Sequence, residues 1–203
     1  MENAQSDFIS VINSLLLIVD YQTAILGEIE SGEQNEIKTA ALATAKAASI
    51  LNVPVVMTSR NESEYGRILS EITDFFPGRE VISRKDSAVN AFDDEKVLQQ
   101  VRKHNRDKLI ITGIPTSEGL TETASMAVRE GYDVYVLIDA CGDKSGERHN
   151  YGVQRMLKAG VTPITWMSLA SEWMNGWADP VIGEMNQEAF GKYNVMLSYL
   201  SRH

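Results

Sequence analysis

The sequence predicts one α/β domain built in three layers, a parallel sheet of about six strands with helices on both faces. Two observations lead to this prediction. Short apolar runs without polar alternation recur along the chain, as is typical of strands buried on both faces. Segments with helical spacing of their apolar residues lie singly between these runs, and single crossovers of this kind join parallel strands.

The predicted strands and helices alternate from residue 14 to residue 177. Strands are expected at 15–19, 53–58, 80–83, 108–113, 132–139 and 161–166. Helices are expected at 33–51, 93–104, 117–131, 145–159 and 168–176. We expect Asp93 and Ser117 to cap two helices, because their side chains accept hydrogen bonds from backbone N–H groups. Gly131 and Gly160 are expected to end two helices.

The domain is expected to span residues 1–177, followed by an appended tail at 178–203. The tail holds more apolar side chains than a solvated segment needs, namely Met185, Phe190, Tyr193, Met196, Leu197 and Tyr199. We therefore expect the tail to pack on the domain or on a neighbouring subunit.

The composition excludes several classes of protein. The 203 residues are 43% hydrophobic and 23% charged, as in an ordinary globular domain, and they carry a net charge of −9. This charge argues against binding to nucleic acid or to anionic lipid. The longest apolar run, at 15–19, is too short to cross a bilayer. The first ten residues contain no Lys or Arg, which is unlike a secretory signal, so we expect a cytoplasmic protein.

Three positions stand where the strands of the predicted sheet end, which is where open α/β sheets bind ligands. Asp20 ends the first strand, Lys85 follows the third, and the loop 113–119 follows the fourth. A desolvated Asp20 paired with Lys85 would form a reactive site. In the alternative interpretation, Asp20 caps the next segment and Lys85 is solvated. Spacing alone leaves both interpretations open.

A resemblance to a known family favours the site. The segment 16–22, Lys85 with the following Asn90-Ala91-Phe92, and the segment 112–124 resemble the isochorismatase-like hydrolase family. The resemblance covers about 14–177 in the same order. It implies the three-layer, Rossmann-like fold, a homo-oligomer and a small-molecule substrate.

The resemblance also implies a triad of Asp, Lys and Cys. Asp20 and Lys85 match the first two members, and Gly119 stands at the cysteine position. Since glycine has no side chain, covalent catalysis by a thiolate is excluded at this position. The single cysteine, Cys141, lies one strand further on, either at the rim of the pocket or as a buried filler. One cysteine also excludes an internal disulfide.

Four further residues flank the matched positions and are expected to bind substrate: Tyr21, Phe92, Pro115 and Thr116. Phe92 is equally compatible with a place in the core. The family turn implies a cis peptide before Pro115, which proline makes less costly. The resemblance also implies that the N–H at this position helps to bind a developing oxyanion; because proline has no N–H, that donor is missing here.

Two functions remain open. One is hydrolysis without a thiol, with Asp20 as general acid or base beside Lys85, as the resemblance implies for members that hydrolyse vinyl ethers such as isochorismate. The other is a catalytically inactive binding or regulatory relative. The three histidines are scattered along the chain, so no metal is expected, and no cofactor is expected either. Arg60 and Glu62 would either line the edge of the pocket or lie in a solvated loop. Arg148 and His149 would either reach the pocket of a neighbouring subunit or lie on the surface.

Overall fold

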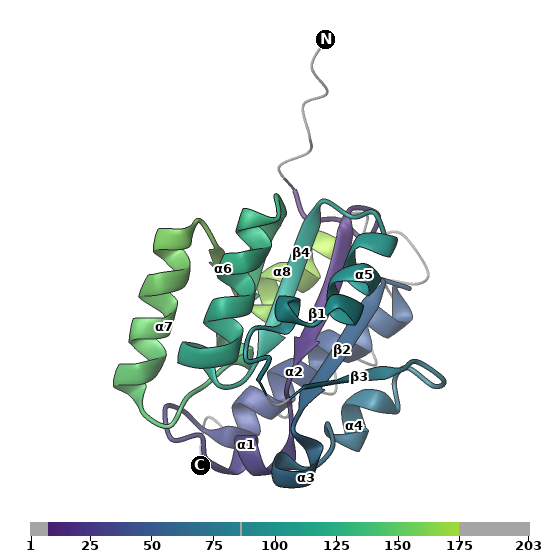
Figure 1. Cartoon of the computed structure of the whole chain (residues 1–203). Helices are drawn as coiled ribbons and strands as arrows, with labels where there is room; N and C mark the ends of the chain where they lie inside the picture. The colour runs from purple at the N-terminus through teal and green to yellow at the C-terminus, as the bar shows by residue number, and fades with distance from the viewer. Residues whose placement is uncertain (1–7, 86, 175–203) are drawn as a thin grey trace.

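The computed structural model describes residues 8–85 and 87–174, and in these residues six strands form one parallel sheet (Figure 1). The strands are β1 Ser14–Val19, β2 Val55–Arg60, β3 Val81–Arg84, β4 Lys108–Gly113, β5 Asp133–Leu137 and β6 Thr162–Ile164. Their order across the sheet is β3-β2-β1-β4-β5-β6, and every neighbouring pair is parallel. The predicted fold class is confirmed.

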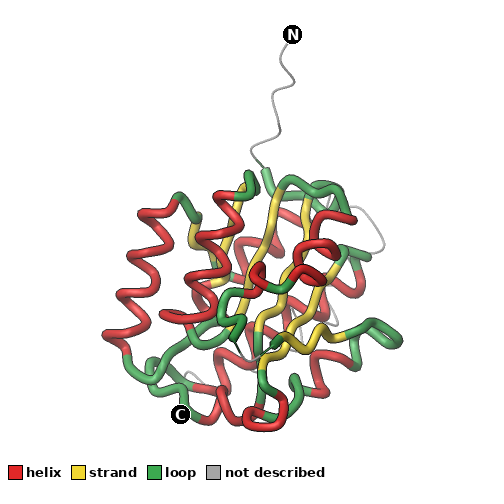
Figure 2. The backbone as a smooth tube through the Cα atoms, viewed as in Figure 1, coloured by secondary structure: helices red, strands yellow, loops and turns green. Residues whose placement is uncertain are grey.

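Helices cover both faces of the sheet, which gives the three layers seen in Figures 1 and 2. They are α1 Thr23–Gly27, α2 Gln34–Ile50, α3 Glu62–Tyr65, α4 Ser70–Thr73, α5 Glu95–Lys103, α6 Thr121–Arg129, α7 Gly146–Ala159 and α8 Trp166–Trp173. In the view of Figure 1, α5, α6 and α7 lie in front of the sheet, and α2 and α8 lie behind it.

The side chains of β1 show why its apolar run is continuous. Leu16 and Ile18 belong to the core under α2 and α8, whereas Leu15, Leu17 and Val19 belong to the core under α5, α6 and α7. Successive side chains of a strand point to opposite faces. A central strand that is covered on both sides therefore needs apolar residues at every position.

Two expected helix starts were wrong. Asp93 lies in a short 3₁₀ turn, and it is Asp94 whose side chain accepts the N–H of Lys96 at 2.9 Å and caps α5. Ser117 does not cap a helix, because residues 116–120 form a wider π-type turn and α6 begins only at Thr121. The two expected helix ends are confirmed by the positive φ angles of Gly131 (91°) and Gly160 (94°).

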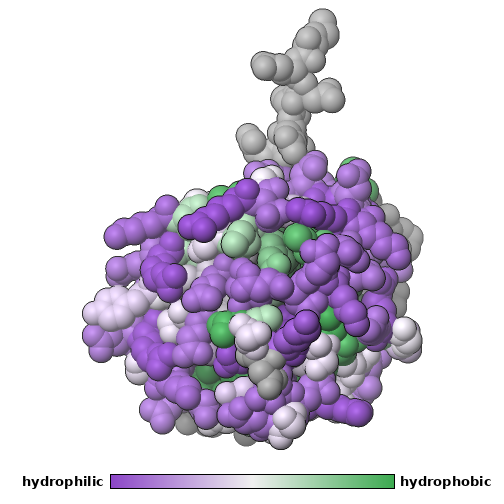
Figure 3. Space-filling view, in the orientation of Figure 1, coloured by the Kyte–Doolittle hydropathy of each residue, from purple (hydrophilic) through white to green (hydrophobic). Residues whose placement is uncertain are grey.

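The face of the molecule in Figure 3 is mainly hydrophilic, with small apolar areas scattered over it. Within the part of the chain that is described, no helix combines the length and the hydropathy needed to span a membrane. The predicted tail at 178–203 lies outside the described residues.

Candidate functional site

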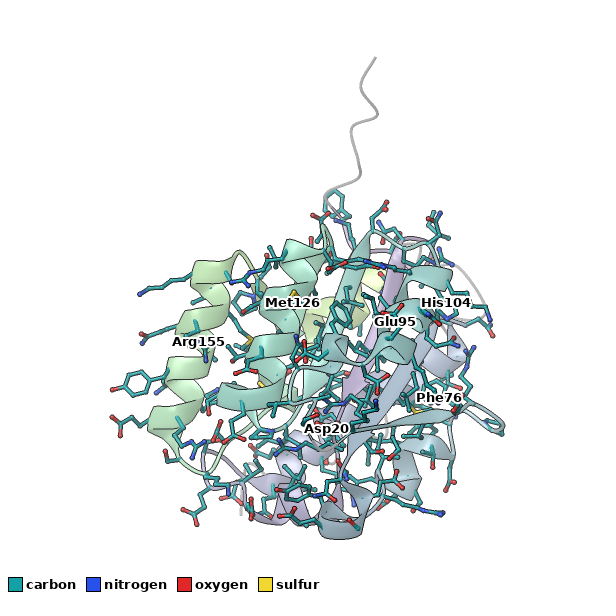
Figure 4. All side chains as sticks on the ribbon, in the orientation of Figure 1. Asp20, Phe76, Glu95, His104, Met126 and Arg155 are labelled. Atoms are coloured by element: carbon teal, nitrogen blue, oxygen red, sulfur yellow. The ribbon has the colours of Figure 1, made fainter. Side chains whose placement is uncertain are left out.

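The centre of the sheet provides the setting for a site. β1 and β4 are adjacent, and the chain leaves them toward opposite edges of the sheet, so a crevice is expected beyond their carboxyl ends. Gly113 ends β4 at a very close approach to β1, since a Cβ added to Gly113 would lie 2.7 Å from both Cβ and the carbonyl oxygen of Val19. Only glycine fits there. Figure 4 labels Asp20 at this end of the sheet.

Asp20 is held firmly in an uncommon backbone conformation. Its φ angle is +57°, in the left-handed region that Asp and Asn tolerate better than other residues with side chains. Its N–H donates to the carbonyl oxygen of Thr58 at 3.1 Å, and the Thr58 hydroxyl donates to Oδ1 of Asp20 at 3.1 Å. The Asp20 side chain is fully buried, with 0% of its surface exposed.

Arg84, rather than Lys85, is the cationic partner of Asp20. An ion pair joins Nη2 of Arg84 to Oδ2 of Asp20, and both side chains are fully buried. The other terminal nitrogen, Nη1, donates to the carbonyl oxygens of Ala88 and Val89. These bonds anchor the guanidinium against the loop that follows β3.

The expected pairing of Asp20 with Lys85 is therefore corrected. Side chains alternate along β3, so Ile82 and Arg84 are buried on one face, whereas Ser83 and Lys85 are exposed. Lys85 lines a separate cavity of about 410 Å³ beside the start of α5. A displacement of one residue along a strand moves a side chain to the opposite face.

The surroundings of Asp20 raise its pKa although a cation is paired with it. Burial raises the pKa of the Asp20 carboxyl above its ordinary value, and it outweighs the opposing effects of Arg84, Arg60 and the Thr58 hydroxyl. A larger fraction of Asp20 is therefore protonated near neutral pH than in an exposed aspartate. A carboxyl group in this state can donate a proton.

Gly119 lies beside this carboxyl group. A Cβ added to Gly119 would lie 3.8 Å from Oδ2 of Asp20 and 3.1 Å from the carbonyl oxygen of Val89. Gly119 belongs to the π-type turn 116–120, in which Glu118 has non-helical angles of φ −110° and ψ −108°. Turns of this type are frequent at functional sites. The fold thus brings the ends of β1 and β3 and the turn after β4 together around Asp20.

Pro115 directly precedes this turn, and the peptide bond between Ile114 and Pro115 is cis. Thr116 is fully buried, and its N–H donates to the carbonyl oxygen of Gly142 at 2.9 Å. Its hydroxyl lies 2.9 Å from Nδ1 of His149. The backbone N–H of Thr116 is therefore already occupied, and Pro115 offers none.

Tyr21 and Phe92 are both buried in the core, and their expected contact with substrate stays a prediction. The Tyr21 ring is fully buried, and its hydroxyl bonds to Oγ1 of Thr112 at 2.5 Å and to the carbonyl oxygen of Ala140. Phe92 is 7% exposed and packs on Tyr132 with ring centroids 6.4 Å apart. Burial of a large aromatic ring contributes favourably to the free energy of folding, which explains why both side chains lie in the core.

A chain of charged residues extends from the site, and of its members only Arg60 and Arg148 were expected from the sequence. Glu118 lies 3.8 Å from Nη2 of Arg60 and 2.5 Å from Nη2 of Arg148. Arg148 in turn contacts the buried Asp143 through Nε at 3.1 Å, and Asp143 accepts the N–H of Ser117 at 2.6 Å. Acidic and basic groups therefore alternate along the loops at this end of the sheet. Because these residues lie far apart in the sequence, the alternation could not be predicted from it.

Cys141 lies apart from Asp20 in a second cavity of about 250 Å³, which Asp139, His149 and Trp166 also line. Its thiol is buried and donates to the carbonyl oxygen of Ile138 at 3.3 Å. Burial raises the pKa of the Cys141 thiol to about 12. Since the thiolate is the reactive form, Cys141 is a poor nucleophile at neutral pH.

Asp139 supplies a prediction about stability and pH. Both carboxylate oxygens accept the N–H of Trp166 at 3.1 Å, and burial raises the pKa of Asp139 to about 6. A folded-state pKa above the ordinary value means that Asp139 stabilises the fold at low pH and that this contribution is lost as the pH rises from about 4 to about 6.

We expect the Asp139→Asn variant to gain stability relative to the wild type across that pH interval, by up to about 3 kcal/mol. Asparagine can still accept the N–H of Trp166 but does not ionise. Urea unfolding of both proteins between pH 4 and pH 7.5 measures the difference, in which other titrating groups cancel. A difference that does not change with pH would contradict the assignment.

The side chains in 8–85 and 87–174 form no cluster of three or more His, Cys, Asp or Glu residues placed to hold a metal ion.

Comparison with known proteins points to one family. The isochorismatase domain model matches residues 14–168. The chain is 28% identical to the probable hydrolase YcaC of Escherichia coli over 172 residues, which cover 84% of this chain and 82% of that protein. It is 32% identical to the isochorismatase of Bacillus subtilis over 165 residues, which cover 71% of this chain and 51% of that protein.

Solved structures agree with this result. The E. coli YcaC gene product, described as an octameric hydrolase of unknown specificity, matches with a TM-score of 0.86 at 27% identity. YcaC from Pseudomonas aeruginosa, solved with hexane-2,5-diol and covalent acrylamide, matches with a TM-score of 0.86 at 26% identity. Each match covers 97% of this chain and 98% of the other.

Proposed function

The chain belongs to the isochorismatase family, and from that premise we propose that it hydrolyses a small molecule without a thiol nucleophile. Asp20 is the proposed general acid or base, and Arg84 is its cationic partner. The observation that carries the proposal is the position of Gly119, whose missing side chain would point to within 3.8 Å of the Asp20 carboxylate. Gly119 has no side chain that could act as a nucleophile, and the buried carboxyl group of Asp20 lies next to it.

The proposed reaction is water-dependent. With its raised pKa, Asp20 donates a proton to an enol ether, and water then completes the hydrolysis without a covalent intermediate. Arg84 orients the carboxyl group and stabilises its charged form after the proton has left. Pro115 offers no N–H for an oxyanion, which matters for amide hydrolysis and not for protonation of an enol ether.

A second candidate is a non-catalytic binding relative. It is favoured by the burial of the central pair, since the side chains of Asp20 and Arg84 are both 0% exposed. A substrate would have to displace the loop at Val89 or the Arg84 side chain to reach Asp20. A protein that no longer turns over substrate has no need of such a movement.

We also propose that the chain forms a homo-oligomer. This proposal is supported by the similarity to E. coli YcaC, which is octameric.

A substrate screen tests the proposed function. Isochorismate and simple vinyl ethers should be assayed beside simple amides, with the wild type and the Cys141→Ala variant, before and after treatment with iodoacetamide. We expect hydrolysis of a vinyl ether that survives both alkylation and Cys141→Ala to within about twofold, because the Cys141 thiol is buried and its pKa is about 12.

Amide hydrolysis that stops when Cys141 is alkylated would overturn this assignment. If no substrate is turned over while small molecules still bind near Asp20, the non-catalytic relative becomes the better interpretation.

A further inference from the structure

We propose that a cavity at the amino ends of β2 and β3 binds a compact dianion, namely a phosphate group. The cavity has a volume of about 230 Å³, and its lining includes Arg79, Gln100 and His104. It is separate from the Asp20 site, because Asp20 follows the carboxyl end of the parallel strand β1. Figure 4 labels His104 at the end of α5, apart from Asp20. The inference goes beyond the proposed function and does not rest on it.

The cavity lies where α5 packs against the sheet. Its floor is apolar, and the side chains that form it are at most 5% exposed, namely Val55, Val56 and Ile82. Arg79 enters from the loop before β3, where its N–H donates to the carbonyl oxygen of Phe76 at 3.0 Å and closes a tight turn. The backbone of Arg79 is therefore held in place beside the cavity.

Basic side chains from two parts of the chain surround His104. Arg79 precedes β3, Lys103 is the last residue of α5, and Arg106 follows this helix by three residues. Burial lowers the pKa of the His104 imidazole most, and the charges of these three neighbours lower it further. Three cations thus act on one side chain that lines the cavity.

These basic residues have no anionic partner among residues 8–85 and 87–174. The side chains of Arg79, Lys103 and His104 make no hydrogen bond or ion pair there. The Nε of Arg106 is buried and has no acceptor, which is uncommon because an unpaired buried donor is costly. The protein carries a net charge of −9, so an excess of basic residues in the composition does not explain a cluster of unpaired cations.

The end of α5 accounts for only part of the arrangement. Basic side chains at a helix C-terminus interact with a partial charge of about −0.5, which gives Lys103 and His104 a structural reason to be there. Arg79 belongs to a different segment and has no such reason. One carboxylate, that of Glu80, also lines the cavity. Together, the helix end and Glu80 leave more than one positive charge unbalanced, which a dianion neutralises better than a monoanion.

The donors of the lining suit a tetrahedral anion. The guanidinium of Arg79, the amide of Gln100 and the imidazole of His104 come from a loop and a helix, so they approach a ligand from different directions. A phosphate accepts hydrogen bonds on several sides, whereas a carboxylate accepts them mainly in one plane. The volume and the apolar floor leave room for a small organic group attached to the phosphate.

Calorimetry of the full-length protein at pH 8 tests the inference. The probes are inorganic phosphate, phenyl phosphate and sodium acetate at equal ionic strength. We expect saturable binding of both phosphates and none of acetate. Tighter binding of phenyl phosphate would assign the cavity to a phosphate monoester, because the ring can cover the apolar floor. Equal affinities would assign it to free phosphate.

Variants locate the binding. Phosphate affinity should fall about 10- to 100-fold in Arg79→Gln, the range expected for lost charge-assisted hydrogen bonds. It should fall several-fold in Arg106→Gln, which removes a neighbouring charge. Arg155→Gln is the matched control, because it removes the same charge from an exposed position on α7, labelled in Figure 4. This control should change the affinity less than about twofold, as expected of a distant surface charge.

The C2–H signal of His104 gives a second measurement, which His104→Gln identifies. Sulfate is the probe, because it has the shape and charge of phosphate and does not titrate between pH 5 and pH 8. A bound dianion should raise the pKa of His104, since it favours the charged imidazolium. The signal of His149, which lines a different cavity, should titrate as before.

The outcomes are independent of the proposed hydrolysis. No saturable binding of phosphate, acetate binding of equal strength, an equal loss of affinity in Arg155→Gln, or an unchanged His104 pKa with sulfate would overturn the inference. Asp20→Asn should bind phosphate as the wild type does, because Asp20 lies beyond the other end of the strands. A failure of the phosphate site therefore leaves Asp20-dependent hydrolysis standing, and absence of hydrolysis leaves the phosphate site standing.

Discussion

An Asp20→Asn variant should hydrolyse the substrate of this protein about 10²–10⁴-fold more slowly than the wild type, which is the usual contribution of one positioned general acid or base. Asparagine preserves the shape of the side chain and can still accept the Thr58 hydroxyl, which lies 3.1 Å from Oδ1 in the wild type. It cannot exchange a proton with substrate. The loss should therefore appear in kcat, measured under saturating substrate.

Lys85→Gln is the informative comparison. The structure places Lys85 on the exposed side of the chain, away from the Asp20–Arg84 pair, so its removal should change kcat less than about threefold, as expected of a surface side chain. A catalytic lysine would be as sensitive as Asp20. Equal losses in the two variants would restore the Asp20–Lys85 pairing, and an unchanged rate in Asp20→Asn would remove Asp20 from the mechanism.

The fold could be predicted because its signals are local and repeated. β1 and β4 are apolar at successive positions, which only a strand covered on both faces requires. Gly131 and Gly160 mark helix ends because their φ angles of 91° and 94° are costly for other residues. Each of these signals lies within a few residues of the feature that it predicts.

The partner of Asp20 was wrong by one residue because β3 has only four residues, too few to establish the alternation of its faces. The sequence did contain an indication of the correct partner, because Arg84 follows the apolar Ile82 by two residues and side chains two residues apart point to the same face of a strand. Fully buried arginines are rare, so an arginine in that position is not the first interpretation. Lys85 was assigned instead, because it follows the predicted third strand and matches the lysine of the family triad.

The surroundings of Tyr21 could not be predicted for a different reason. Side-chain direction alternates along β1 up to Val19, but the positive φ of Asp20 interrupts the strand. Beyond such a residue, the parity of the strand no longer tells where the next side chain points. The π-type turn at 116–120 likewise has no sequence signature, so the start of α6 and the environment of Glu118 required the structure.

Replacing Arg84 by methionine should have the largest effect on stability. Removing one member of a buried ion pair leaves the other charge uncompensated, which typically costs about 3–5 kcal/mol. Arg84 also satisfies the carbonyl oxygens of Ala88 and Val89, which adds to the loss. Urea unfolding at pH 7 of the wild type, Arg84→Met, Asp20→Asn and the double variant measures the free energies of unfolding.

The sign of the Asp20→Asn effect should depend on residue 84. With Arg84 present, Asp20→Asn destabilises the protein because a buried guanidinium loses its carboxylate. In the Arg84→Met background the same change should stabilise it, because a buried, unpaired carboxylate is removed. Additive effects in this cycle would mean that Asp20 and Arg84 do not interact.

The free energy of unfolding of the Arg84→Met variant should also depend on pH more steeply than that of the wild type. Without the arginine, burial raises the pKa of Asp20 further above its ordinary value, since the largest opposing effect is gone. A raised folded-state pKa stabilises the fold below the ordinary pKa of aspartate, and this contribution is lost as the pH rises through the folded-state value. The single variant should therefore lose more stability between pH 5 and pH 8 than the double variant, which has no carboxyl group at residue 20 to ionise.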